Sequence, residues 1–179
     1  MGVRKAEIED VGAMSLVHSR TWKKAYVDFI SEEYLENISD EGWIPLFSRA
    51  LRENAHNAAV YETDGKITGT ITFGHARKDL PLETGTLQHT SPLHSAEGEI
   101  ISLYVLPEYW STKQGYELMK FAVESLKNQG FKSCFLWVIK DNERAANFYR
   151  RFGFTGKGEL MNVILAGLPV TEEKYELIF

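Results

Sequence analysis

Residues 99–139 contain the feature that most constrains the fold, which is two apolar runs separated by one amphipathic stretch. The runs EIISLYV at 99–105 and FKSCFLWVI at 131–139 have the length and apolar character of strands. Between them, residues 112–129 repeat apolar side chains at helical spacing, and Gly130 predicts the end of that helix. A strand–helix–strand unit implies a parallel pair of strands joined by a right-handed crossover.

The remaining segments predict antiparallel strands and further helices around that unit. The runs NAAVYE and KITGTITFG flank Thr63-Asp64-Gly65, and Asp-Gly is the strongest short hairpin signal. Capping residues and periodicity then place the other elements. We expect strands at 3–7 and in the tail EEKYELIF, and helices over about 10–27, after Ser31, over about 40–53, and from Asp141 or Asn142 to Gly153. The prediction is a single α/β domain over residues 1–179, with a mixed sheet and helices on both of its faces.

Residues 76–97 show no periodicity and include two prolines. A segment of this length without secondary structure is usually functional in a compact domain. We therefore expect a long functional or mobile loop here, which would act as a lid if it lies near a substrate entrance.

Composition and charge exclude several classes of function. The net charge is −5 and no dense Lys/Arg cluster occurs, which argues against a nucleic-acid partner and is compatible with a cationic substrate. No apolar run approaches the roughly 20 residues that span a bilayer, so a cytoplasmic location without membrane association is expected. The single cysteine, Cys134, lies in an apolar strand and is interpreted as a packing thiol. The histidines lack ligand spacing, so no metal is expected.

Two motifs resemble those of the GCN5-related N-acetyltransferase (GNAT) family. Residues 142–154 fit the pattern N-x-x-A-x-x-F-Y-x-x-x-G-F, and residues 99–107 fit E-I-x-x-L-Y-V-x-P. The resemblance implies a central twisted sheet that splays between its fourth and fifth strands, here 99–105 and 133–139. It also implies acetyl-CoA in that gap, with the pantetheine arm pairing with the backbone near Leu103 and Val105.

The stretch PEYWSTKQGYELM, from Pro107 to Met119, joins the first strand of that unit to its helix. A helix N-terminus at the carboxyl end of a strand attracts phosphates through free N–H groups and the helix dipole. The family turn [RQ]-x-x-G-x-[GA] aligns with residues 110–115, where Trp110 replaces the first residue and Lys113 replaces the first glycine. By this resemblance the coenzyme-binding residues are Leu103, Val105, Trp110, Ser111, Thr112, Lys113, Gln114, Gly115, Tyr116 and Asn142.

Lys113 is the main departure from the family turn, and two opposing effects of similar size decide its consequence. A side chain costs roughly 1–2 kcal/mol if the backbone at this position requires a positive φ. An ammonium group beside a pyrophosphate contributes about 1.5–3 kcal/mol. The sequence alone leaves open which effect dominates, and also whether Lys113 is simply a solvated residue of the first helical turn.

The resemblance also implies catalytic roles. Tyr149 would donate a proton to the departing thiolate, because a phenol is protonated at neutral pH. Glu99 would act as the general base that deprotonates the amine, with Glu97 as a competitor for that role. Trp22 and Tyr26 resemble a segment that lines the acceptor side in one bacterial branch, although packing within a helix explains them equally well.

The sequence therefore predicts an acetyltransferase that transfers acetyl from acetyl-CoA to a primary amine by direct attack in a ternary complex. The backbone N–H of Val105 would polarise the thioester carbonyl. A non-catalytic acyl-CoA-binding module on the same fold is the alternative. The acceptor is a small molecule or a peptide amine, and both a monomer and a homodimer remain open.

Overall fold

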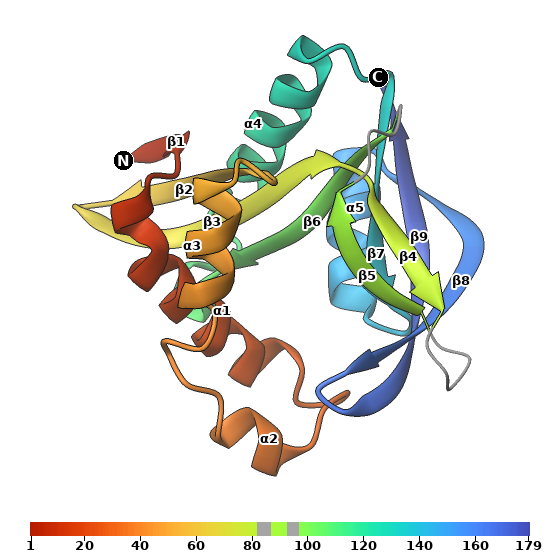
Figure 1. Cartoon of the computed structure of the whole chain (residues 1–179), viewed down its shortest axis with the longest axis horizontal. Coiled ribbons are helices and arrows are strands. Elements are labelled where there is room, and N and C mark those ends of the chain that lie inside the picture. The colour runs from red at the N-terminus through yellow and green to blue at the C-terminus, as the bar shows by residue number, and fades with distance from the viewer. Residues whose placement is uncertain (82–86, 93–96) are drawn as a thin grey trace. The chain divides into compact units, whose positions relative to one another are not determined.

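The computed structural model describes residues 1–81, 87–92 and 97–179. The chain forms two compact units, one made of residues 1–73 and 102–125 and the other of residues 74–101 and 126–179. Strands and helices of both units appear in Figure 1. Both are mixed α and β structures, as predicted, and the expectation of one domain stays a prediction.

The first unit is built on β1 (Gly2–Lys5), β2 (Asn57–Thr63), β3 (Lys66–His75) and the second half of β6 (Gly98–Val105), which neighbour one another in that order. β1 and β3 both pair with β2 in antiparallel orientation. Thr63 pairs with Lys66, so the hairpin loop consists of Asp64 and Gly65 at φ 50 and 76. Two positive φ values define a type I′ turn, which confirms the hairpin prediction.

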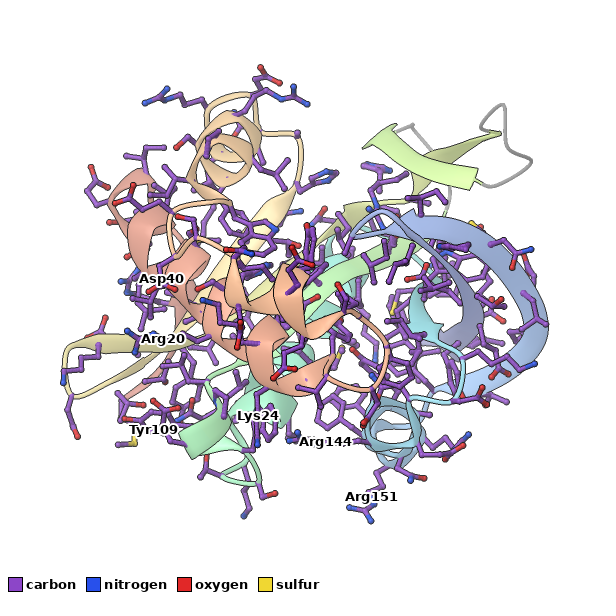
Figure 2. The ribbon with its side chains drawn as sticks, turned by 90° about the horizontal axis from the view of Figure 1, so that it is seen from below. Arg20, Lys24, Asp40, Tyr109, Arg144 and Arg151 are labelled. Atoms are coloured by element: carbon purple, nitrogen blue, oxygen red, sulfur yellow. The ribbon has the colours of Figure 1, made fainter. Side chains whose placement is uncertain are left out.

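Helices α1 (Val11–Ala25), α2 (Glu32–Glu36) and α3 (Ile44–Arg52) follow β1. Met14, Val17 and His18 are buried on one face of α1, as predicted. Figure 2 shows Arg20 and Lys24 on α1. The predicted cap is also present, because Ser31 Oγ accepts a hydrogen bond from the Tyr34 N–H at 3.4 Å.

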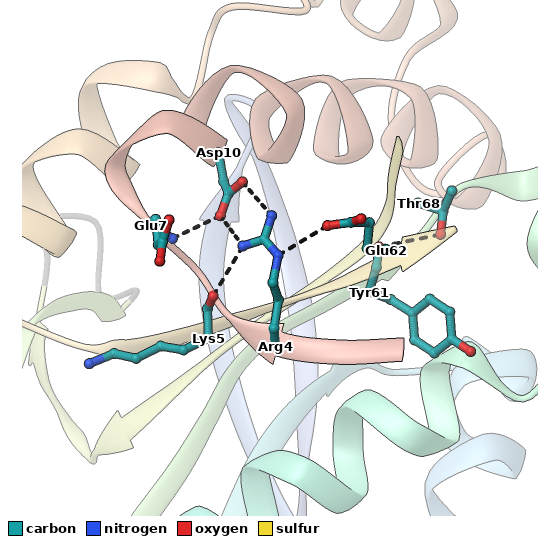
Figure 3. A network of polar contacts seen from close by, with 7 residues as sticks. All are labelled: Arg4, Lys5, Glu7, Asp10, Tyr61, Glu62 and Thr68. Atoms are coloured by element: carbon teal, nitrogen blue, oxygen red, sulfur yellow. Dashed lines mark hydrogen bonds and ion pairs between the residues drawn. The ribbon is translucent and has the colours of Figure 1, made fainter. Parts of the chain in front are cut away.

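A polar network fixes the start of the chain (Figure 3). The Arg4 guanidinium contacts both carboxylate oxygens of Asp10, at 2.7 and 2.9 Å, and reaches Glu62 of β2 at 3.1 Å. Asp10 also accepts the backbone N–H of Glu7 at 2.8 Å. Hydrogen bonds from Arg4 hold the pKa of Asp10 below its usual value. The network therefore joins β1, β2 and the beginning of α1.

The second unit contains the start of β6 followed in space by β7 (Ser133–Ile139), β9 (Leu168–Ile178), β8 (Thr155–Leu165), β5 (Leu87–Pro92) and β4 (Arg77–Pro81). β7 is parallel to β6, through Gly98 with Cys134 and Glu99 with Phe135, which confirms the predicted parallel pair. The predicted splay between these two strands stays a prediction. Antiparallel pairs join β7 to β9 and β9 to β8.

Two sequence predictions for this unit need correction. The predicted loop at 76–97 is wrong for residues 77–81 and 87–92, which form β4 and β5, whereas residues 82–86 and 93–96 lie outside the described residues. β5 gains a parallel partner in β8, with Leu87 opposite Val163, and such a distant partner leaves no periodic signal in the sequence. β8 itself was not predicted.

Helix ends agree more closely with the sequence. Gly130 and Gly153 follow α4 (Gln114–Asn128) and α5 (Glu143–Phe152), with φ 93 and 117, as expected of helix C-caps. α4 begins at Gln114 rather than Thr112, because Lys113 has a left-handed backbone that no helix contains. Among the described helices, none has the length and apolar content needed to cross a membrane.

Candidate active site

The turn before α4 has a left-handed backbone at two positions that are not glycine. Ser111 has φ 65 and Lys113 has φ 71. Lys113 therefore has the positive φ that favours glycine. The backbone cost of roughly 1–2 kcal/mol, which the sequence left open, applies to this residue. Ser111, Thr112 and Lys113 are exposed, Gly115 is half-buried, and Tyr116 is exposed. The turn leads into the N-terminus of α4, and a helix N-terminus presents backbone N–H groups that can bind an anion.

The end of β6 is fixed to this turn and to α1 through one carbonyl group. The Val105 carbonyl accepts a hydrogen bond from the Trp110 indole at 2.7 Å and one from the Thr21 hydroxyl at 3.1 Å. A carbonyl oxygen has two lone pairs, so these donors satisfy it. Any further contact that the Val105 backbone makes is therefore a donation from its N–H. Leu103 is half-buried two residues earlier.

The predicted acceptor residues Trp22 and Tyr26 belong to an aromatic cluster, and all members of this cluster lie in the first unit. The rings of Trp22 and Tyr26 are 4.9 Å apart, and the hydroxyls of Tyr26 and Tyr104 are 3.0 Å apart. Trp43 lies 5.4 Å from Trp22. We call this group the aromatic cluster: His18, Trp22, Tyr26, Trp43 and Tyr104.

His18 forms the buried end of the aromatic cluster. Its ring lies 4.3 Å from that of Tyr104 and 4.8 Å from that of Phe47. Burial lowers the pKa of His18 to about 3, so the ring is neutral at physiological pH. Within the described part of the chain, His18 Nε2 and Trp22 Nε1 are buried without a hydrogen-bond partner. The cluster thus combines aromatic faces and unused polar atoms without adding a positive charge.

Charged side chains lie on the adjacent segments of the same unit. Asp40 accepts a short hydrogen bond from Ser19 of α1, and Arg20 Nε lies 3.9 Å from Asp40 Oδ2 (Figure 2). This pair is half-exposed, and such surface pairs contribute little to stability. Its position ties the segment that follows α2 to the middle of α1.

Tyr149 and Asn142 belong to α5 in the second unit. Asn142 Oδ1 accepts the Ala145 N–H at 3.1 Å, so its side chain caps the helix, as the sequence predicted. Tyr149 is half-buried, and its ring makes edge contacts with Phe148 and Phe154 at 5.2 and 5.9 Å. The motif at 142–154 therefore builds a capped helix that presents Tyr149 on a partly covered face.

Glu99 is buried in an ion pair that the sequence did not indicate. It is 1% exposed, and Arg77 Nη2 lies 2.6 Å from its Oε1. The Arg77 Nε is 3.1 Å from both carboxylate oxygens, and the Arg77 backbone N–H donates to Oε2 at 2.8 Å. Glu99 is therefore a buried, ion-paired carboxylate at the start of β6, and its role as general base stays a prediction. Glu97, two residues earlier, is exposed.

Sequence reasoning missed Arg77, Trp43 and Tyr104 as neighbours of the predicted site residues. Arg77 lies in the segment interpreted as a loop, and nothing local links it to Glu99, 22 residues away. Trp43 and Tyr104 had an available signal, which was their aromatic character near elements already assigned to the site. Cys134 behaves as predicted, because it is fully buried, and burial raises the pKa of its thiol to about 12.

Comparisons with known proteins agree with this architecture. The Acetyltransferase (GNAT) family matches residues 21–154. A spermidine N(1)-acetyltransferase from Thermoplasma acidophilum is 30% identical over 152 residues, which cover 85% of this chain and 86% of that protein. The N-acetyltransferase YuaI from Bacillus subtilis is 27% identical over 144 residues, which cover 78% and 72% of the two chains.

Solved structures share the fold at lower sequence identity. The PaiA N-acetyltransferase from Thermoplasma acidophilum, crystallised with coenzyme A, has a TM-score of 0.70 at 23% identity and covers 99% of this chain and 98% of its own. A ribosomal-protein-alanine N-acetyltransferase from Brucella melitensis has a TM-score of 0.70 at 16% identity, with full coverage of both chains.

The mixed α and β fold matches that of solved N-acetyltransferase structures. The family match extends over most of the sequence, and the chain therefore belongs to the GNAT family. It is an acetyl-CoA-dependent N-acetyltransferase.

Proposed function

We propose that this enzyme transfers acetyl from acetyl-CoA directly to a primary amine, with both substrates bound at once. The left-handed turn at Ser111 and Lys113, placed directly before the N-terminus of α4, is the observation that carries the proposal. Direct attack is favoured because Cys134 is buried and its thiol is protonated at neutral pH, which removes the only cysteine as an acyl carrier.

The residues of the turn fit the coenzyme's pyrophosphate. Backbone N–H groups at the start of α4 would bind it, and the exposed Lys113 ammonium would add a charge-assisted contact. Trp110 would contribute indirectly, because its indole is already bonded to the Val105 carbonyl. The Val105 N–H would be the donor to the thioester oxygen.

Tyr149 is our candidate for the general acid. The thiolate that leaves acetyl-CoA takes up a proton, and a phenol supplies one at neutral pH. The T-shaped contacts with Phe148 and Phe154 restrict the ring, which favours a fixed position for its hydroxyl group.

Glu99 is our candidate for the general base, and its ion pair sets a condition on that role. Both of its oxygens already accept hydrogen bonds from Arg77, so proton uptake requires that contact to loosen or a water molecule to relay the proton. Glu97 is exposed and remains the competitor. The pH–rate profiles of Glu99→Gln and Glu97→Gln, measured in parallel, assign the base. Only replacement of the true base should shift the profile toward the pKa of the amine.

The aromatic cluster supports a cationic amine as acceptor. Aromatic faces attract ammonium groups by about 0.5–2 kcal/mol, and the neutral His18 imposes no repulsion. The overall charge of −5 also favours a cation. The similar spermidine N(1)-acetyltransferase is named for a substrate of this chemistry. We therefore propose a polyamine-like acceptor with more than one ammonium group.

A thiol-release assay with an amine panel tests the proposal. Spermidine, a monoamine of equal length, and a peptide with a free N-terminus separate multivalent cations from simple amines. We expect the highest kcat/KM with spermidine, and Trp22→Leu should raise the KM for spermidine by roughly threefold to thirtyfold. Coenzyme A binding by calorimetry without turnover on any amine would instead favour a non-catalytic module.

A further inference from the structure

A single residue of β3 holds both ends of the turn at 107–113. The Thr68 carbonyl accepts the N–H of Leu106, just before the turn, at 2.9 Å. The Thr68 hydroxyl lies 2.8 Å from Oε1 of Gln114, just after the turn. The entrance and the exit of the turn are therefore tied to the same point of the sheet.

The contact with Gln114 belongs to a closed ring of three hydrogen bonds. Gln114 Nε2 donates to Thr63 Oγ1 at 3.2 Å, and Thr63 Oγ1 lies 3.2 Å from Thr68 Oγ1. An amide oxygen only accepts, so Thr68 donates to Gln114, and Thr63 in turn donates to Thr68. The Thr68 hydroxyl also lies 3.4 Å from the Tyr61 carbonyl (Figure 3). This contact is longer, and the hydroxyl proton of Thr68 is already donated to Gln114.

Burial makes this ring resistant to rearrangement. Thr63, Thr68 and Gln114 are 7%, 1% and 4% exposed, so water does not compete for their polar atoms. In such an environment, consecutive hydrogen bonds polarise one another and strengthen. Each side chain donates once and accepts once within the ring, and loss of any member leaves a buried group without a partner.

Tight packing beside the ring fixes the distance between β3 and α4. A Cβ atom at Gly69 would lie 2.9 Å from Leu118 Cδ1 of α4 and 3.2 Å from Val105 Cγ2. A side chain at this position would require Leu118 or Val105 to shift, so glycine favours the close approach of the first turns of α4 to the strand that carries Thr68.

We propose that Thr63, Thr68 and Gln114 are positioning residues, which hold the turn in the shape that receives the pyrophosphate of acetyl-CoA. The turn needs such support because Ser111 and Lys113 have left-handed backbones that side chains disfavour. A turn with free ends would relax, and the coenzyme would then have to order it. This inference rests on the proposed function, since it takes the turn as the coenzyme's binding site.

Thr68→Val tests the proposal, because valine retains the branched shape and removes only the hydroxyl. Thr70→Val is the matched control. Thr70 lies two residues further along β3, is fully buried, and within the described part of the chain its hydroxyl has no hydrogen-bond partner. Thr68→Ser restores the hydroxyl and should rescue the defect.

We expect Thr68→Val to raise the Kd for coenzyme A and the KM for acetyl-CoA by roughly tenfold. The kcat at saturating coenzyme and the KM for the amine should change little, which a general loss of structure would not produce. Amide hydrogen exchange without any ligand should accelerate at 107–116 in Thr68→Val and remain unchanged in Thr70→Val.

The outcomes separate this inference from the proposed function. Wild-type affinity and exchange in Thr68→Val would overturn the positioning role, as would an equal defect in Thr70→Val. If the wild-type protein bound no coenzyme A, the proposed function would fail, while the exchange experiment would still decide whether the ring holds the turn. Thr63→Val opens the same ring from β2 and provides the test if Thr68→Val does not fold.

Discussion

Lys113→Gly should stabilise the folded protein without improving coenzyme binding. The φ of 71 at Lys113 costs roughly 1–2 kcal/mol relative to glycine, which adopts this conformation freely. Glycine also increases the entropy of the unfolded chain, which lowers the stability of the variant by about 0.5–1 kcal/mol and offsets part of the relieved strain. The net gain is about 0.5–1 kcal/mol, which corresponds to a rise in Tm of about 1–4 °C for a chain of this size.

The effect on coenzyme binding depends on whether the backbone strain at Lys113 arises on folding or on binding. We expect the left-handed backbone to be a property of the folded turn itself, so its strain is a cost of folding and not of binding. Lys113→Ala removes the ammonium and keeps the strained backbone, whereas Lys113→Gly removes both. The two variants should therefore bind coenzyme A equally, each about twofold to tenfold more weakly than wild type because an exposed charge is lost. That loss should shrink at high salt.

Thermal unfolding and isothermal calorimetry measure these two quantities independently. Ala166, at φ 53 in the loop between β8 and β9, provides a control, because Ala166→Gly changes a left-handed residue elsewhere and should leave coenzyme affinity unaltered. A Tm for Lys113→Gly below that of Lys113→Ala would refute the strain argument. Tighter coenzyme binding by Lys113→Gly than by Lys113→Ala would show that strain is released on binding instead.

Further predictions concern the catalytic candidates, the N-terminal network and the buried thiol. Tyr149→Phe should lower kcat by on the order of tenfold to a thousandfold with coenzyme affinity unchanged, and an unaltered kcat in a chemistry-limited assay would remove this residue from the mechanism. Glu99→Gln should lower kcat/KM at neutral pH and recover as pH rises, provided that circular dichroism shows an intact fold once the charge partner of Arg77 is lost. Asp10→Asn should lower the free energy of unfolding by about 1–2 kcal/mol at pH 7. Because the folded-state pKa of Asp10 is lowered, this difference should vanish as pH falls below the unfolded pKa of about 3.9 and through the folded pKa. Urea titrations at several pH values measure it. Cys134 should resist alkylation at pH 8 until urea unfolds the chain, and rapid labelling of the native protein would contradict its burial.

The sequence by itself determined features that depend on neighbouring residues. Asp64 and Gly65 specify a type I′ turn because both adopt positive φ readily, and Asn142 specifies a helix start because its side chain reaches the N–H of Ala145. Gly153 specifies the end of the same helix. These local choices, with the apolar pattern between them, were sufficient to place the parallel pair and the motif that resembles the family.

The tertiary structure alone decided features that depend on distant partners. Glu99 is an ion-paired residue because β4 brings Arg77 beside it. β5 is a strand because it pairs with β4 and with the distant β8, although β4 and β5 lack strand periodicity in the sequence. Lys113 has a left-handed backbone in a turn whose two ends both contact Thr68, a residue distant from it in the sequence. A side chain's conformation and charge environment are set by what packs against it, and that information lies elsewhere in the chain.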